Sequence, residues 1–223
     1  MATAKTAEIE FKFLIKKEQI DDVKAYVERC GAANETLALT NQYFDTPKRV
    51  LHNHKIGLRI RRWNDQLEQT VKLAGEQIGA MSIRPEYNVP LQLSDALNGV
   101  PNLALFPSDI WPASISIADL QINLQQQFQV DFERQRWLVK AAGATFEAAI
   151  DSGAIQAGAL QKAICELEVE LVDGDAEGLL AWANELQQQF SLPAGTLSKA
   201  QRGFALAAQA AASSNVATSR GND

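Results

Sequence analysis

The chain contains few of the residue types on which most catalytic and metal sites are built. Its 223 residues include only two histidines, His52 and His54, and two cysteines, Cys30 and Cys165, which lie far apart. A zinc site or a disulfide framework is therefore not expected, and a reducing cytoplasm fits this use of cysteine. We expect the two histidines to lie in a solvated loop. The sequence has no P-loop, no HExxH pair and no nucleophile elbow, so any hydrolysis would depend on water positioned or activated by a metal ion.

Long apolar runs and a basic excess are also missing. No segment approaches the ~20 apolar residues that a membrane-spanning helix needs, and residues 1–7 have no apolar signal core. We therefore expect a cytoplasmic protein without a membrane partner. The formal net charge of −6 argues against a general nucleic-acid binder, which usually carries a basic excess. The 46% of hydrophobic residues is enough for a sizeable core in one domain.

What the chain does contain is charge that alternates with apolar residues at strand spacing. Two acidic segments, 8–13 and 165–171, carry glutamate at every second position over most of their length, and basic segments at 58–61 and 70–73 show the same period. In a strand this spacing puts the charged side chains on one face and the apolar ones on the other. The acidic strands could form a solvated sheet face. Two separate acidic strands are better explained by a shared divalent cation, because Mg²⁺ and Mn²⁺ prefer carboxylate oxygens.

Basic residues occur on several predicted strands, and each one alone could be ordinary surface charge. They are Arg59, Arg61, Lys72, Arg84, Arg134 and Arg136. In a barrel, alternate residues of every strand point inward, and an interior lined by arginine and lysine repels itself unless a polyanion or the glutamates neutralise it. The planar arginine side chain matches phosphate oxygens. The pattern therefore favours a site that binds a phosphate polyanion together with metal cations.

The predicted secondary structure is mostly strand. Apolar spacing predicts strands at residues 8–15, 37–45, 57–63, 67–73, 82–89, 127–140, 144–150 and 164–172. Helices are expected at 17–30, at 175–190 and from Ser198 onwards, a loop at 75–79, short helices and loops in 94–125, and a turn at 151–153. About eight strands with few helices between them favour a mainly antiparallel sheet or a closed barrel. We expect a domain over residues 1–207, and a disordered tail or linker over 208–223.

The charged segments occur in an order that resembles a known family, the CYTH superfamily or triphosphate tunnel metalloenzymes. The matching blocks are Glu8-Ile9-Glu10-Phe11-Lys12, which fits the ExExK signature, and residues 43–47, 58–61, 70–72, 84–87, 134–137, 151–153, 166–170 and 198–203. The resemblance extends over nearly the whole chain to about residue 207. Blocks 84–87 and 198–203 are most similar to bacterial inorganic triphosphatases of this family.

The resemblance implies an α+β, mainly β fold. This is a closed antiparallel barrel of about eight strands around a hydrophilic tunnel, with helices packed outside and the last helix as a plug. It implies hydrolysis of inorganic triphosphate to pyrophosphate and phosphate with Mg²⁺ or Mn²⁺. The implied metal ligands are Glu8, Glu10, Glu166, Glu168 and Glu170, and the implied catalytic residues are Glu8, Glu10, Lys12 and Glu168. The implied substrate-binding residues are Lys12, Arg59, Arg61, Lys72, Arg84, Glu86, Arg134, Arg136, Asp151, Lys199 and Arg202.

Alternatives remain open at this point. A thiamine or nucleoside triphosphatase, or a class IV adenylate cyclase, would need to hold an organic group, and the sequence shows no convincing aromatic clamp. A polyphosphate-binding module without turnover would leave the acidic strands unnecessary. No residue is an obvious acid for the leaving group. In bacterial relatives a helical CHAD domain often follows, and we find no such domain in this sequence.

Overall fold

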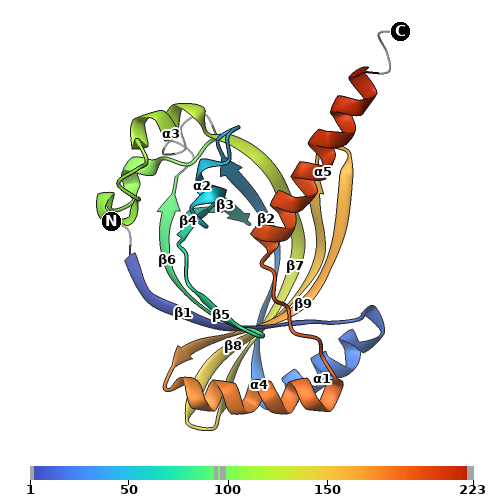
Figure 1. Cartoon of the computed structure of the whole chain (residues 1–223). Helices are drawn as coiled ribbons and strands as arrows, with labels where there is room; N and C mark the ends of the chain where they lie inside the picture. Colours follow the sequence, from blue (N-terminus) through green and yellow to red (C-terminus); the bar gives the residue numbers. More distant parts are fainter. Residues whose placement is uncertain (1–2, 93–94, 96–98, 220–223) are drawn as a thin grey trace.

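The centre of the molecule is a closed antiparallel β-barrel. The structure is a computed structural model that describes residues 3–92, 95 and 99–219, and Figure 1 shows the ring of strands. The strands follow one another in the order β1-β9-β8-β7-β2-β3-β4-β6, and β6 pairs with β1 to close the ring. Their bounds are β1 Thr3–Leu14, β2 Gly31–Asp45, β3 Gly57–Trp63, β4 Gln66–Lys72, β6 Met81–Leu91, β7 Gln125–Ala141, β8 Ala144–Ala157 and β9 Leu160–Asp173. The predicted mainly β barrel is confirmed.

Helices surround the barrel. They are α1 Ile20–Cys30, α2 Val50–Asn53, α3 Ile117–Asn123, α4 Ala176–Phe190 and α5 Lys199–Ser219, with 3-10 turns η1 Lys17–Gln19, η2 Leu103–Leu105 and η3 Ser108–Ile110. In Figure 1, α1 and α4 lie together against one side of the strands, and α5 begins at the barrel and extends away from it. Within the described ranges, no helix combines the length and the apolar character needed to cross a membrane.

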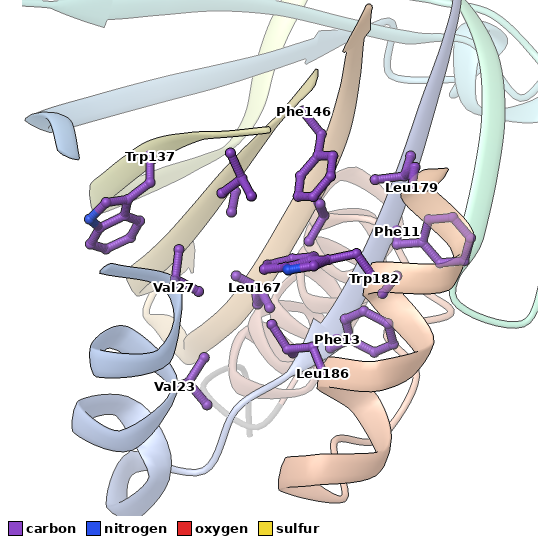
Figure 2. Close-up of a cluster of buried hydrophobic side chains, with 14 of the residues drawn as sticks. Phe11, Phe13, Val23, Val27, Trp137, Phe146, Leu167, Leu179, Trp182 and Leu186 are labelled. Carbon is purple, nitrogen blue, oxygen red and sulfur yellow. The ribbon is translucent and has the colours of Figure 1, made fainter. Parts of the chain in front are cut away.

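The apolar faces of the strands point outward, where helices cover them. Phe11 and Phe13 of β1 alternate with the inward Glu10 and Lys12, and they belong to a buried cluster that includes Trp182 of α4. Figure 2 shows this cluster between the strands and the two helices α1 and α4. Each large side chain buried in this way stabilises the fold by about 1.5–3 kcal/mol. Because the outer faces provide the core, the inner faces are free to carry charge.

A second cluster covers the outer face of β3, β4 and β6. Leu58, Ile60 and Val71 from these strands pack with Phe106 and Trp111, which come from the segment between β6 and β7. This segment holds η2, η3 and α3, which agree with the short helices expected in residues 94–125. Both clusters lie on the outer side of the barrel, and the charged side chains of the strands lie on the inner side.

Two local predictions were wrong. The predicted turn at residues 151–153 is part of β8, where Gly153 is opposite Phe132 of β7. A β-carbon at Gly153 would lie 2.1 Å from the carbonyl oxygen of Asp131, so this glycine permits a close approach of two strands instead of a turn. The turn comes later, at Gly158, whose φ of 55° suits glycine.

The predicted loop at 75–79 contains a short strand, β5 Glu76–Ile78, which pairs with β6. All three of its side chains are exposed, so no apolar alternation marks it in the sequence. At the other end of the chain, α5 continues as a helix to Ser219, through most of the segment expected to be a tail. Residues 220–223 lie outside the described residues, and the boundary at residue 207 stays a prediction.

Candidate active site

The barrel encloses a cavity of about 680 Å³, a size that suits a small-molecule ligand. Of the predicted site residues, those that line the cavity are Glu8, Glu10, Lys12, Arg59, Arg61, Lys72, Arg84, Glu86, Arg134, Arg136, Glu168, Glu170 and Lys199. The other three lie behind this wall: Asp151 and Glu166 pair with wall residues, and Arg202 pairs with Glu166. The structure therefore brings the predicted set together around one cavity, while the role of each residue remains a prediction.

Strand register determines which charges meet. Lys72 of β4 is directly opposite Glu86 of β6, and Arg134 of β7 is directly opposite Asp151 of β8. Directly opposed residues share one face of an antiparallel sheet with their β-carbons about 4.5–5.5 Å apart. Side chains of opposite sign therefore meet inside the barrel at both positions.

One ionic group joins β1, β3, β4 and β6. The ammonium of Lys72 lies 2.6 Å from Glu8 and 2.7 Å from Glu86, and Arg59 lies 3.8 Å from Glu86. Burial raises the pKa of Glu8 to about 8, although Lys72 opposes this. Burial acts in the same direction on Glu86, but Lys72, a hydrogen bond from Glu8 and Arg59 together outweigh it and lower its pKa far below the usual range. The pair therefore holds one proton on Glu8 and one charge on Glu86 at neutral pH.

A second ionic group surrounds three carboxylates, Asp151, Glu166 and Glu168, which we call the carboxylate cluster. The ammonium of Lys199, at the start of α5, lies 2.6, 2.5 and 2.9 Å from these three residues in that order. Arg134 donates two parallel hydrogen bonds of 2.7 Å to Asp151. Both Asp151 and Glu166 are fully buried, so the alternative of a solvated acidic face does not hold.

Other cations complete this second group. Arg202 pairs with Glu166, and Arg134 also lies 2.5 Å from Glu168. Lys12 lies 3.1 Å from Glu10 and 3.6 Å from Glu168. Burial would raise the pKa of Glu168, but Lys199, Lys12 and Arg134 outweigh it and hold this pKa well below the usual range. Glu168 is therefore charged at neutral pH.

The carboxylate cluster fits a divalent cation in its donor chemistry. One oxygen from each of its three residues lies within 4.8 Å of the others, and carboxylate oxygens are the ligands that Mg²⁺ and Mn²⁺ prefer. Oε1 of Glu166 and Oε1 of Glu10 are buried, and each lies beside a lysine ammonium, that of Lys199 at 2.5 Å and that of Lys12 at 3.1 Å. These residues could hold a metal, together with Glu8 and Glu170 on the cavity wall.

Two arginines in the cavity have no acidic partner. Among the described residues, Arg61 and Arg84 form no ion pair: Arg61 donates from Nε to Asn41 and Arg84 donates from Nε to Ser82, each at 3.0 Å. Burial, followed by repulsion from Arg59 and Arg134, lowers the pKa of Arg61 to about 10. This part of the cavity therefore carries positive charge that a bound anion would neutralise.

Arg136 lies at the edge of the site. It pairs with Glu35 and, at 3.3 Å, with Glu147, and its side chain is 30% exposed. Because both acidic partners already share its charge, Arg136 is less available to a bound anion than Arg61.

Several residues of the cavity wall were not predicted. Glu68 and Glu147 line the cavity, and both occupy inward positions of their strands, in phase with Lys72 and Asp151. The alternation could therefore have identified them. No sequence signal pointed to His52, which was expected in a solvated loop.

His52 is half-buried on α2 and lines the cavity. Its ring centre lies 4.7 Å from that of Phe204 of α5, and its backbone N–H donates to the buried carboxylate of Asp45. His54 is exposed, and its ring nitrogen Nδ1 contacts the carbonyl of Val50. The expected solvated setting is thus correct for His54 and wrong for His52.

Solved structures share this fold at low sequence identity. A Hippeastrum protein, described as a candidate adenylyl cyclase with a dominant triphosphatase activity, superimposes with a TM-score of 0.66 at 16% identity, over 86% of this chain and 92% of that one. A candidate adenylate cyclase from Bacillus halodurans superimposes with a TM-score of 0.61 at 22% identity, over 89% and 98% of the two chains. These similarities support the barrel architecture.

The sequence itself is similar to a curated relative. An inorganic triphosphatase from Haemophilus influenzae is 32% identical over 200 residues, which are 89% of this chain and 54% of that protein. The chain thus spans about half the length of this curated relative. The sequence profile of the CYTH domain matches residues 6–204, which hold all the charged residues of the cavity wall. The chain therefore belongs to the CYTH domain family.

Proposed function

We propose that this protein hydrolyses inorganic triphosphate to pyrophosphate and phosphate inside the barrel, with Mg²⁺ or Mn²⁺. One observation carries the proposal: the cavity inside the barrel holds arginines that form no ion pair with any described residue, beside buried carboxylates. Arginines of this kind favour a polyanion, and the carboxylates favour a hard cation. The name of the Haemophilus relative supports the same activity.

The basic residues of the wall bind the phosphates in this proposal. Arg59, Arg61 and Arg84 come from two strands, β3 and β6, which β4 separates in the ring, and their side chains line the same cavity. Planar guanidinium groups can each donate two hydrogen bonds to phosphate oxygens. Because they are fixed by the barrel before substrate arrives, they stabilise the charge of the transferred phosphoryl group without reorganisation.

The acidic residues hold the metal. A bound Mg²⁺ or Mn²⁺ would screen the phosphate charge and lower the pKa of the attacking water. Glu8, Glu10, Glu168 and Glu170 line the cavity and supply carboxylate oxygens. The water oxygen would bond to the terminal phosphorus as the bridging P–O bond breaks, with the water proton passing to the leaving pyrophosphate or to solvent, and phosphate and pyrophosphate would then leave the cavity.

A second candidate is an organic triphosphate. Part of the cavity wall is apolar and aromatic, with Leu37, Leu39, Tyr43, Trp63 and Phe204. Aromatic side chains of this kind can pack against a ring attached to a phosphate chain. Thiamine and nucleoside triphosphates are therefore the substrates to compare with inorganic triphosphate.

We infer a cytoplasmic setting because Cys30 and Cys165 are both free thiols and half-buried, as a reducing compartment allows. We propose a small-molecule triphosphate as the partner, and neither a nucleic acid nor a membrane. A CHAD-type partner domain stays a prediction.

The test is phosphate release from inorganic triphosphate, ATP and thiamine triphosphate, measured side by side with Mg²⁺, Mn²⁺ or EDTA. We expect metal-dependent release that is fastest with inorganic triphosphate. Preference for an organic triphosphate would favour the second candidate. Tight, metal-independent binding of polyphosphate without phosphate release would indicate a binding module instead.

A further inference from the structure

Lys199 occupies the centre of the carboxylate cluster. Its ammonium lies within 2.9 Å of an oxygen of each carboxylate, and the residue is 6% exposed. The oxygens of the cluster are therefore arranged around a cation, and in this structure that cation belongs to the protein itself. A divalent cation at the same place would contact the same oxygens.

The start of α5 is held firmly, so the side chain of Lys199 is the part that can move. Ser198 and Gln201 cap the helix reciprocally: the N–H of Gln201 donates to Ser198 Oγ at 3.1 Å, and the N–H of Ser198 donates to Gln201 Oε1 at 2.8 Å. Gly203 packs so closely on Phe128 that a β-carbon there would lie 2.0 Å from the ring. Lys199 also lines the cavity, so its long, flexible side chain can turn from the carboxylate cluster into the cavity.

The charges around the cluster already balance. Four carboxylates face four cations: Glu10, Asp151, Glu166 and Glu168 face Lys12, Arg134, Lys199 and Arg202. A divalent cation added to this group would leave two uncompensated positive charges in a buried site, which is strongly unfavourable. Either an anion must accompany the metal, or a resident cation must leave the cluster.

We propose that Lys199 is an internal competitor for the metal: its ammonium occupies the cation position of Asp151, Glu166 and Glu168 until a divalent cation displaces it into the cavity. There its positive charge faces the phosphates of the substrate. Metal alone therefore binds weakly, and triphosphate strengthens metal binding because it accepts the displaced charge. This inference extends the proposed function, but it rests only on cation binding and not on turnover.

The first test measures the binding of Mn²⁺ by calorimetry to EDTA-treated protein without triphosphate. A negative result in this test says nothing against triphosphate hydrolysis, which is measured separately. Lys199→Met removes the ammonium and keeps an unbranched side chain. We expect Mn²⁺ to bind this variant at least about tenfold more tightly than the unaltered protein, which corresponds to about 1.4 kcal/mol. Lys162→Met, at an exposed position of β9, is the matched control and leaves the affinity unchanged. Equal or weaker affinity in Lys199→Met, or no binding to either protein, would overturn the proposal.

A second test needs no variant and applies even if Lys199→Met fails to fold. The unaltered protein is treated with an amine-acetylating reagent, with and without Mn²⁺, and the acetylation of each lysine is measured by mass spectrometry. Displacement from three carboxylates makes the Lys199 amine more reactive, so we expect Mn²⁺ to raise its acetylation several-fold relative to the exposed Lys140. Unchanged acetylation of Lys199 at saturating Mn²⁺ would mean that the metal binds without displacing it.

Discussion

Arg61→Met should make the protein more stable and a weaker enzyme. The guanidinium of Arg61 has no acidic partner within the described part of the chain and faces Arg59 and Arg134, which lower its pKa after burial does. Methionine keeps the unbranched side chain and removes the charge. If the positive charge is retained for a bound polyanion, the folded protein without substrate is stabilised by losing it.

The size of the effect follows from the shift in pKa. A pKa of about 10, against an ordinary value of about 12.5, corresponds to about 3 kcal/mol against the charged side chain. Cavity water screens part of this, and loss of the hydrogen bond to Asn41 costs about 1 kcal/mol. We therefore expect a net gain of about 1–2 kcal/mol in the free energy of unfolding, or about 2–8 °C in Tm. Loss of charge-assisted hydrogen bonds to phosphate should lower kcat/KM by about 10²-fold.

The assays are thermal unfolding of the metal-free protein and phosphate release from inorganic triphosphate. Arg62→Met is the matched control, because Arg62 is the next residue of β3 and is exposed. It should change stability by less than about 0.5 kcal/mol and leave kcat/KM nearly unchanged. A less stable Arg61→Met protein with unaltered kcat/KM would refute the reasoning, since Arg61 would then be a structural residue.

Glu168→Gln should lower kcat by about 10²-fold and destabilise the protein by about 3–5 kcal/mol, because buried cations lose a charged partner; near-normal phosphate release would contradict the metal-binding role. In the metal-free protein, the pKa of Glu8 is about 8 in the folded state and about 4.3 in the unfolded state. Between these values the folded protein binds a proton on Glu8 that the unfolded protein has lost, so the free energy of unfolding falls as pH rises from 5 to 8. Glu8→Gln should remove this slope in urea unfolding, and an unaltered slope would assign it to another group. Gly203→Ala should destabilise the protein by about 1–3 kcal/mol, because the new methyl group meets the buried ring of Phe128; a higher Tm would show that the ring can yield.

Strand alternation predicted the inward face of the barrel. Glu8, Glu10 and Lys12 are in phase on β1, and this phase alone places them on one side of the strand, opposite Phe11 and Phe13. The same phase on β3 places Arg59 and Arg61 together. The period of the charges is therefore a local property, which the sequence records directly. The closed ring needed the number of strands and the family resemblance as well.

Partnerships between distant segments could not be predicted in this way. Asp151 was placed in a turn because aspartate and glycine favour turns, yet it is a buried strand residue that pairs with Arg134 and Lys199. These contacts depend on the register of β7 with β8 and on where α5 begins. The contact of His52 with Phe204 is of the same kind, because it joins residues far apart in the chain.

The most direct test of the central hypothesis is product analysis by phosphorus NMR after incubation of the protein with inorganic triphosphate. With Mg²⁺ or Mn²⁺ we expect pyrophosphate and phosphate in equal amounts, and with EDTA we expect intact triphosphate. Intact triphosphate in the presence of either metal, or the same products in EDTA, would contradict metal-dependent hydrolysis in this cavity.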